Sequence, residues 1–308
     1  ERGVVLGVSS KNTDEIAMRV FKEHPDMLLR PDDIAIFRIN WTDKAANIED
    51  IAKTLNLGLQ SIVFLDDNPA ERARVRKALP EVGVPEVGDN AADYPSLVIQ
   101  AGYFNSTRFS REDAKRADMY TQNAKRADAL EALGDYGEYL ASLNMKVSLR
   151  PFDETGRSRI AQLISKSNQF NLTTRRYSAA EIKDIQEAPD RFHLQVRLAD
   201  SFGDNGMISV VIANKSESDW IIDLWLMSCR VLGRRVEEVV LAHIVDAAKA
   251  AGVERLIGHY IPTDRNGIVE DHYAKLGFKH EESDNKDCTV WALNIADYTA
   301  PDLPFEIA

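Results

Sequence analysis

Two adjacent acids, Asp66 and Asp67, follow an apolar run and come directly before a helix start. Ser10 closes an earlier apolar run, and Lys44 opens a later helical pattern. A hydroxyl, an ammonium and two carboxylates suit a phosphate beside Mg²⁺, because Mg²⁺ takes oxygen ligands and keeps several waters. The metal would also neutralise the like charges of the acid pair. We therefore expect Ser10 and Lys44 to bind the phosphoryl oxygens, and the two acids to bind the metal.

Each of these residues also has an ordinary alternative. A serine at a strand end is often a helix cap, and a single lysine is usually a surface residue. The Asp66-Asp67 pair could simply favour a helix start, because acids are stabilising near the positive end of the helix dipole. The helix after the acids has Asn68 as its expected N-cap and Glu71 three residues on, the spacing of a capping box.

A cysteine marks a second group of residues. Cys229 comes at the end of an apolar strand pattern, beside Arg230 and just before a helix start. Neighbouring cations and a helix start lower a thiol pKa, so the sequence predicts a thiolate able to accept an acyl group. The alternative is a buried structural cysteine, which is common in proteins without disulfides.

Two polar runs are candidate substrate contacts. The first, 166–177, combines amides with two arginines, which suits a phosphorylated or hydroxylated acyl group, although it could be an ordinary loop. The second, 201–207, holds an acid between glycines and could equally be a hairpin turn. The candidate substrate-binding residues are Asn168, Gln169, Asn171, Arg175, Arg176 and Asp204.

The elements that must position these residues alternate between strand and helix over residues 1–105. Apolar runs at 4–10, 34–40 and 61–65 indicate strands, separated by amphipathic helical patterns. Nearly continuous apolar strands with helical crossovers predict a parallel sheet covered on both faces. Ligands bind at the carboxyl ends of the strands in such sheets, which is where Ser10 and Asp66 fall.

The rest of the chain follows a different plan. Residues 106–144 are polar and helical, and we interpret them as a connector. From 145 to 308, strand patterns at 146–153, 192–200, 207–215 and 220–228 predict a largely antiparallel sheet. A long helical pattern then covers 234–252.

The first part resembles the haloacid-dehalogenase superfamily, on the strand followed by Ser-Lys-Asn, on Lys44 in WTDKAANI and on FLDDNPAERARV. The whole chain resembles the FkbH-like proteins, in which such a domain joins an acyltransferase-like domain. This resemblance implies an incomplete Rossmann-like parallel sheet followed by a GNAT-like α+β domain. The family's Asp-x-Asp-x-Thr nucleophile motif is not present upstream of Val4. The chain begins close to a core strand at Glu1, so we expect a longer native protein.

The second part resembles GNAT-type acyltransferases on MSCRVLGRRVEEVV and on RNGIVEDHYAKLGF. In that family the loop at the helix start cradles the pyrophosphate of coenzyme A. Arg235 replaces a small residue there, so it could block coenzyme A or grip the phosphate of a phosphopantetheine arm. The resemblance also implies Tyr273 as an acid for a leaving thiolate. The implied cofactor-binding residues are Arg230, Gly233, Arg234, Arg235 and Asn266.

Composition limits the possible functions. The 308 residues are 44% hydrophobic and 28% charged, with a net charge of -11, which argues against a general nucleic-acid binder. No apolar run is long enough to span a bilayer, and two distant cysteines do not form a disulfide framework. We expect a cytoplasmic protein without membrane or nucleic-acid partners.

The FkbH-like resemblance implies a glyceryl transferase and phosphatase. Such an enzyme takes 1,3-bisphosphoglycerate, a small phosphorylated acyl substrate, and loads glyceryl onto the thiol of an acyl carrier protein in polyketide-type biosynthesis. We expect a local basic patch at Arg230, Arg234 and Arg235 to dock this acidic partner. A GNAT-type enzyme that uses acyl-coenzyme A is one alternative. A non-catalytic module that docks carrier proteins is another.

Overall fold

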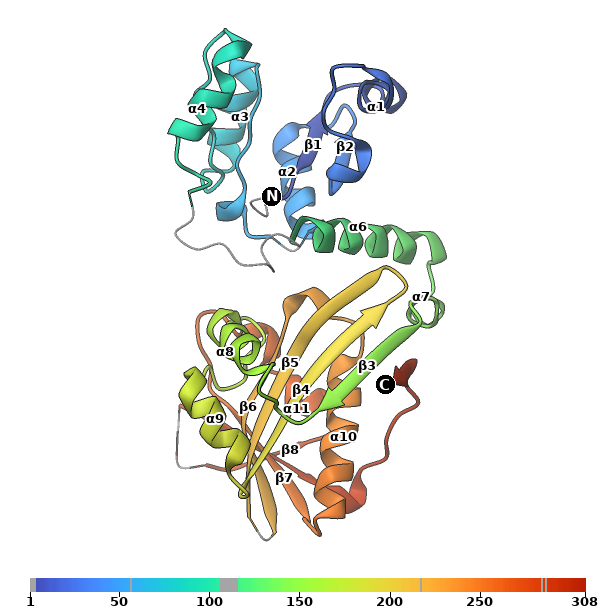
Figure 1. The fold of residues 1–308 in the computed structure, drawn as a ribbon, viewed down its shortest axis with the longest axis vertical. Helices are drawn as coiled ribbons and strands as arrows, with labels where there is room; N and C mark the ends of the chain where they lie inside the picture. Colours follow the sequence, from blue (N-terminus) through green and yellow to red (C-terminus); the bar gives the residue numbers. More distant parts are fainter. Residues whose placement is uncertain (1–3, 56, 106–115, 217, 284, 286) are drawn as a thin grey trace. The chain divides into compact units, whose positions relative to one another are not determined.

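A computed structural model describes residues 4–55, 57–105, 116–216, 218–283, 285 and 287–308 (Figure 1). The chain folds as two compact units, Glu1–Gly134 and Asp135–Ala308. α6 (Arg116–Leu133) belongs to the first unit and α7 (Tyr136–Ser142) to the second. The predicted division at 105 and 144 stays a prediction, and residues 106–115 lie outside the described part. Within that part, no helix has the length and apolar character needed to cross a membrane.

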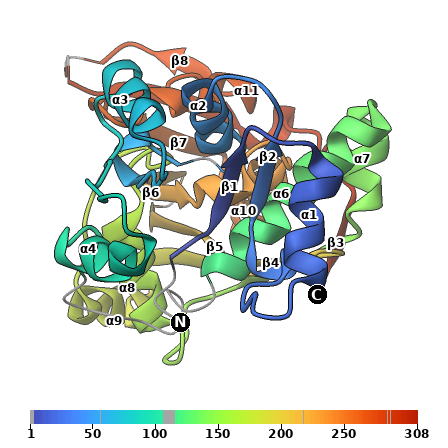
Figure 2. The same cartoon turned by 90° about the horizontal axis from the view of Figure 1, so that it is seen from above.

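The first unit contains a small parallel sheet of β1 (Gly7–Ser10) and β2 (Ile36–Ile39), which lie side by side in Figure 2. Gly7 pairs with Ile36 and Ser10 with Ile39, so both strands end at the same edge. Parallel strands need a long crossover connection, which here contains the first helix. The helices of this unit are α1 (Asp14–Glu23), α2 (Lys44–Thr54), α3 (Pro69–Ala78), α4 (Tyr94–Gln100) and α6, with 3-10 turns at Pro31–Asp33, Leu59–Ser61 and Ala91–Asp93.

The predicted third strand at 61–65 is wrong. Ser61 ends a 3-10 turn, and the extended residues 62–65 make only one isolated parallel bridge, between Val63 and Gly83. The amide of Phe64 donates to the Gly83 carbonyl at 2.8 Å, and the Gly83 amide donates to Ile62 at 2.9 Å. A strand needs a continuous partner, and among the described residues this segment has none. Phe64 is nevertheless buried, with Ile48 of α2 and Val75 of α3, so the segment is fixed by packing.

The second unit is built on one eight-stranded sheet, in the order β10-β3-β4-β5-β6-β7-β9-β8. Neighbouring strands are antiparallel except for β10-β3 and β6-β7, which confirms the predicted α/β class and the largely antiparallel second sheet. The strands are β3 (Met145–Arg150), β4 (Arg191–Asp200), β5 (Gly203–Lys215), β6 (Asp219–Met227), β7 (Arg255–Tyr260), β8 (Lys279–Glu281), β9 (Thr289–Asn294) and β10 (Phe305–Ile307).

Helices cover both faces of this sheet (Figure 1). On one face, α8 (Arg157–Lys166) and α9 (Ala179–Glu187) bury Ile160, Ile164 and Ile182 against β5 and β6. On the other lies α10 (Val236–Ala250), with seven buried residues in its apolar stripe. The remaining helices are α11 (His272–Lys275) and 3-10 turns at Cys229–Val231, Gly267–Val269 and Ile295–Asp297.

A loop segment lies between the ends of β6 and β7. These strands pair only over Asp219–Ile222 and Arg255–Gly258. Beyond that point, the amide of Leu172 donates to Trp225 at 3.1 Å, and the amide of Met227 donates to Phe170 at 3.1 Å. On the β7 side, the amide of Ile261 donates to Leu172 at 2.9 Å. The backbone amides and carbonyls named here are therefore hydrogen-bonded to other segments of the same chain.

Candidate functional site

An ion pair joins the Lys44 ammonium to Oδ2 of Asp66 in the first unit. Lys44 is the first residue of α2, whereas Asp66 directly follows the extended 62–65 segment. The two side chains are only 13% and 6% exposed. The ammonium also lies 5.9 Å from the centroid of the Phe64 ring, within the range of a cation–π contact. The structure thus brings together two residues that the sequence assigned to one site.

The backbone after Asp66 is held by several hydrogen bonds. Oδ1 of Asp66 accepts from the Asn68 amide at 2.9 Å. The buried Arg72 guanidinium donates to the carbonyls of Asp66 and Asp67, at 2.9 Å each. Asn68 caps α3 as predicted, accepting from the Ala70 amide at 2.9 Å. This network fixes the loop, while the Asp67 side chain is exposed.

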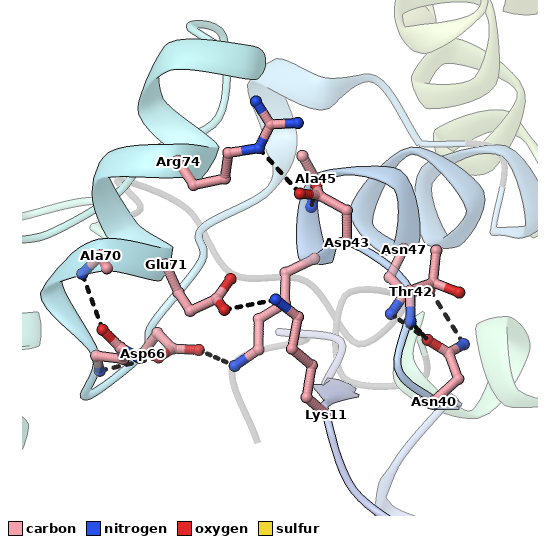
Figure 3. Close-up of polar contacts among 12 residues, drawn as sticks. Lys11, Asn40, Thr42, Asp43, Ala45, Asn47, Asp66, Ala70, Glu71 and Arg74 are labelled. Atoms are coloured by element: carbon pink, nitrogen blue, oxygen red, sulfur yellow. Dashed lines mark hydrogen bonds and ion pairs between the residues drawn. The ribbon is translucent and has the colours of Figure 1, made fainter.

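Sequence reasoning missed a second ion pair at the same place. Lys11 Nζ lies 2.6 Å from Oε1 of Glu71, and Figure 3 shows this contact beside Asp66. The expected capping box is wrong for Glu71, because its carboxylate pairs with Lys11 instead. The sequence feature that could have indicated this ion pair is the position of Lys11, immediately after Ser10 at the end of the strand. The cluster of Lys11, Lys44, Asp66 and Glu71 is called the lysine–acid cluster below.

The serines at the end of β1 take different roles. The carbonyl of Ser10 accepts from the Asn40 amide at 3.0 Å, which extends the sheet pairing. Among the described residues, the Ser10 hydroxyl makes no hydrogen bond to Lys44 or Asp66. Oγ of Ser9 is buried and has no hydrogen-bond partner among the described residues, so it is not accessible to a ligand either.

The start of α2 is anchored to α3 by Asp43. This carboxylate caps α2 through the Ala45 amide and accepts from Nε of Arg74, both at 2.9 Å. The hydrogen bond from Arg74 is the main reason that the pKa of Asp43 is lowered. Asn40 and Asn47 exchange side-chain hydrogen bonds at 2.9 and 3.2 Å in front of the same helix (Figure 3). These contacts hold Lys44 in position.

The donor set at this edge fits Mg²⁺ bound mainly by solvent and substrate. The described residues contain no group of three or more His, Cys, Asp or Glu side chains placed to hold a metal. Mg²⁺ commonly uses one or two carboxylates together with waters and substrate phosphate. Asp66 and the exposed Asp67 supply that number of carboxylates, and both remain the predicted ligands.

Cys229 lies in the 3-10 turn that follows β6 in the second unit, and its side chain is partly buried. Burial raises the pKa of its thiol, and the positive charge of Arg230 only partly offsets this effect. The predicted lowering of the thiol pKa is therefore wrong. The turn that places Cys229 beside Arg230 also partly buries the cysteine side chain. Its predicted acyl-carrying role stays a prediction.

The arginines after Cys229 do not form the basic patch that we expected. Arg234 is buried and lies 3.0 Å from Oδ2 of Asp200, and it also donates to the Arg230 carbonyl at 2.9 Å. Arg235 pairs with Glu238 at 2.7 Å. Most of this positive charge is thus neutralised inside the unit. Arg235 and Gly233 have positive φ angles of 58° and 71°, which form the turn into α10.

Asn266, a predicted cofactor-binding residue, and Tyr273, the predicted acid, are both fully buried. Asn266 is inaccessible, and its amide donates to the carbonyls of Asn171 and Ile261 at 3.0 and 2.9 Å. It therefore ties two loops together and is not available to a cofactor. Tyr273 is also inaccessible, and burial strongly raises the pKa of its phenol. The structure argues against Tyr273 as a proton donor because solvent and ligands do not reach its hydroxyl.

The polar run at 166–177 is mostly structural. Asn171 is buried, and its side chain accepts from the Thr174 amide at 2.8 Å. Arg176 donates to the carbonyls of Ile164 and Ser167 and to the side chain of Asn168. Gln169 is exposed, as is Asp204, which accepts from the Gly206 amide in a turn. Hydrogen bonding within the loop accounts for most of these side chains.

Arg175 instead belongs to a cluster with Tyr177 and Asp223, which the sequence did not indicate. Its guanidinium and the Tyr177 hydroxyl both donate to the carboxylate of Asp223, which is only 4% exposed. Asp223 is the extra residue of a β-bulge in β6, a feature that redirects a side chain. Burial, followed by the charge of Arg175, lowers the pKa of nearby His259. Nothing in the strand pattern marked Asp223, because a bulge depends on pairing between strands.

No protein-family model matches the chain, and no curated protein matches it. Among solved structures, it is similar to the N-terminal part of BF1531 from Bacteroides fragilis, described as containing a phosphatase domain complexed with Mg. That match has 44% sequence identity and a TM-score of 0.34, and it covers 35% of this chain and 29% of that chain. The present chain therefore spans less than a third of that structure.

Acetyltransferases form the other group of similar structures. The ribosomal-protein-S18-alanine N-acetyltransferase from Escherichia coli is 13% identical over 48% of this chain and 94% of its own, with a TM-score of 0.38. The spermidine N-acetyltransferase from Vibrio cholerae, in complex with CoA and spermine, is 12% identical over 49% and 96%, with a TM-score of 0.38.

Proposed function

We propose that the first unit binds a phosphorylated acyl substrate together with Mg²⁺, and that the second unit transfers the acyl group to a thiol. The observation that carries the proposal is the lysine–acid cluster at the carboxyl edge of β1 and β2. Its two ammonium groups match a phosphate, and Asp66 with Asp67 match a divalent cation. When bound, Mg²⁺ would offset the negative charge of the phosphate and of the carboxylates.

Charge balance supports this assignment. Lys11 and Lys44 are each paired with a carboxylate. A phosphate dianion can take over both ammonium groups, which leaves the Asp66 carboxylate available to a cation. The buried Asp66 carboxylate would therefore exchange its lysine partner for a cation and would stay paired.

The FkbH-like resemblance supplies the finer proposal. The substrate would be 1,3-bisphosphoglycerate, and glyceryl would be delivered to the phosphopantetheine thiol of an acyl carrier protein. In the transfer, Cys229 sulfur forms a bond to the acyl carbon, the bond from that carbon to the phosphate oxygen breaks, and the thiol proton leaves with the phosphate. Water must also hydrolyse the phosphate ester at the other end of the acyl group, releasing a second phosphate, before the group is glyceryl. The carrier thiol then displaces Cys229 from the thioester and returns a proton to it.

Intact-protein mass spectrometry of a carrier protein tests the transfer. The protein is incubated with Mg²⁺, 1,3-bisphosphoglycerate and the carrier, and we expect a glyceryl adduct on the carrier. Cys229→Ala should abolish the adduct, whereas Cys288→Ala, at the second free cysteine, should leave it unchanged. An unchanged adduct in Cys229→Ala would disprove the covalent step. Transfer from acyl-coenzyme A alone would favour the coenzyme-A-dependent alternative.

Mg²⁺ titration tests the first unit separately. Asp66→Asn and Asp67→Asn should each weaken Mg²⁺ binding at least tenfold, because each removes a charged oxygen ligand. Asp26→Asn removes an exposed acid of the same unit and serves as the matched control. Equal affinity in all three variants would refute the assigned metal site.

A further inference from the structure

A pocket of about 330 Å³ lies in the second unit, where β3 and β4 meet the start of α8. This volume is typical of a small-molecule site. Three arginines, Arg150, Arg159 and Arg197, line the pocket together with a single acid, Asp153. The lining thus has three positive charges and one negative, a net of +2, in a chain with a net charge of -11.

The strand register places two of the arginines on one face. Ser148 pairs with Arg197 and Arg150 with Gln195 across β3 and β4. Arg150 and Arg197 are therefore diagonal neighbours, a relationship that separates side chains by about 7–8 Å. Like charges at this spacing repel unless an anion lies between them.

Among the described residues, little compensating charge lies beside Arg150 and Arg197. Arg150 has no ion pair among the described residues, and Arg197 lies 3.8 Å from an oxygen of Asp204, which is 67% exposed. A pair of this kind contributes little stability in water. The two guanidinium groups therefore remain able to bind an added anion.

Asp153 does not act as the anion between these two arginines, because its carboxylate oxygens already accept other hydrogen bonds. Oδ1 accepts from the Thr155 hydroxyl at 2.7 Å and from the Gly156 amide at 2.6 Å, while Oδ2 accepts from Gln195 at 2.6 Å. The hydrogen bond from Thr155 is the largest cause of the lowered pKa of Asp153. The acid stays ionised and shapes the floor of the pocket.

The first turn of α8 breaks a local rule. It carries Arg157 and Arg159 and no acid, although cations are unfavourable at the positive end of a helix. Arg157 donates to Gln186 of α9 at 3.0 Å, and Arg159 donates to Gln162, so both side chains also have structural contacts. The arginines and the cavity carry this inference, and the helix start only adds to the positive potential.

We propose that this pocket binds the phosphate monoester group of a small molecule. A phosphate monoester approaches two negative charges, which equals the net charge of the lining, and guanidinium groups bind its oxygens in pairs. The site is independent of the proposed function, because it shares no residue with the lysine–acid cluster or with Cys229.

Calorimetric titration of the full chain with inorganic phosphate is the first test. Arg150→Gln and Arg197→Gln should each weaken binding about tenfold, the loss of one charge-assisted contact. Arg191→Gln removes an arginine from β4 outside the pocket lining and should leave the affinity unchanged. Equal affinities in all variants, or no phosphate binding by the parent chain, would overturn the proposal.

Arginine modification by phenylglyoxal, mapped by peptide mass spectrometry, locates the phosphate. Phosphate should slow modification of Arg150 and Arg197 several-fold, but not that of Arg191. The same protection should persist in Lys44→Met, where the first unit is impaired. Loss of protection in Lys44→Met, or protection of Arg191 alone, would contradict a pocket at α8 and leave the proposed function of the first unit unaffected.

Discussion

The ring of Tyr273 lies directly against Gly258 of β7. A Cβ atom at Gly258 would be 2.3 Å from two carbons of this ring, much closer than van der Waals contact allows. The Tyr273 side chain is fully buried, and its hydroxyl has no well-formed hydrogen bond among the described residues. Tyr273 therefore acts as a packing residue that depends on the absence of a side chain at Gly258.

This contact gives a prediction about stability. Gly258→Ala should lower the free energy of unfolding by about 3 kcal/mol, because the added methyl group overpacks a core without free space. Gly267→Ala is the control, since a Cβ there meets nothing within 4 Å. Urea unfolding followed by tryptophan fluorescence measures both. Similar stability of the two variants would show that the ring moves aside freely.

The phenol itself should be dispensable. Tyr273→Phe removes a buried hydroxyl without changing the packed ring, so the free energy of unfolding should change by less than about 1 kcal/mol. Acyl transfer should proceed at the parent rate. If the transfer rate fell by a hundredfold or more while stability held, the role as an acid would be restored.

The two lysines of the lysine–acid cluster should differ in their effect on stability. Lys44→Met leaves the buried carboxylate of Asp66 without its ion partner, so we expect a loss of about 3 kcal/mol. Lys11→Met affects a pair whose lysine is 34% exposed, and the loss should stay below about 1 kcal/mol. Hydrogen exchange at α2 and α3 measures the change within the first unit. Equal losses would mean that solvent screens both pairs alike.

Stability should fall in acid because of His272. This imidazole packs edge-on against Trp225 and Phe170, and burial lowers its pKa to about 3. The unfolded chain has the ordinary histidine pKa of about 6.5, so its contribution is complete above pH 6.5 and is lost as the pH falls toward 3. In that window the free energy of unfolding should drop by about 1.4 kcal/mol per pH unit from this group.

The variant His272→Leu should show a flatter acid dependence over the same window, measured by unfolding at a series of pH values. His280→Leu, at an exposed position in β8, is the matched control and should keep the parent slope. A parent slope in His272→Leu would show that the imidazole is protonated within the folded state.

Thiol chemistry at Cys229 should be slow near neutral pH. Burial raises the pKa of the thiol, so alkylation by iodoacetamide should speed up about tenfold per pH unit below that pKa. Arg230→Gln removes the charge that favours the thiolate and should slow alkylation of Cys229 roughly threefold. Cys288 serves as the internal reference, because Arg230 is not among the groups that shift its pKa. Equal slowing of both thiols would indicate a general structural effect.

The sequence by itself determined the α/β class, four strands of the second sheet and the long helix over 234–252, because apolar periodicity reports directly on buried faces. It also predicted that Lys44 and Asp66 share a site, which the ion pair confirms, although Asp66 follows an extended segment with one isolated bridge and not a strand of the parallel sheet. The helix start at Asn68 was equally readable, because a cap is a local interaction.

Only the tertiary structure decided which charged side chains are available to a ligand or partner. Arg234 and Arg235 looked like a free basic patch in the sequence, yet Asp200 and Glu238 neutralise them in the fold. Asp200 is 34 residues away from Arg234, and no local pattern predicts such a pairing. The same holds for the bulge at Asp223 and for the burial of Cys229. Accessibility and charge pairing depend on which distant segments pack together, so the candidate chemistry was visible in the sequence, whereas its availability was not.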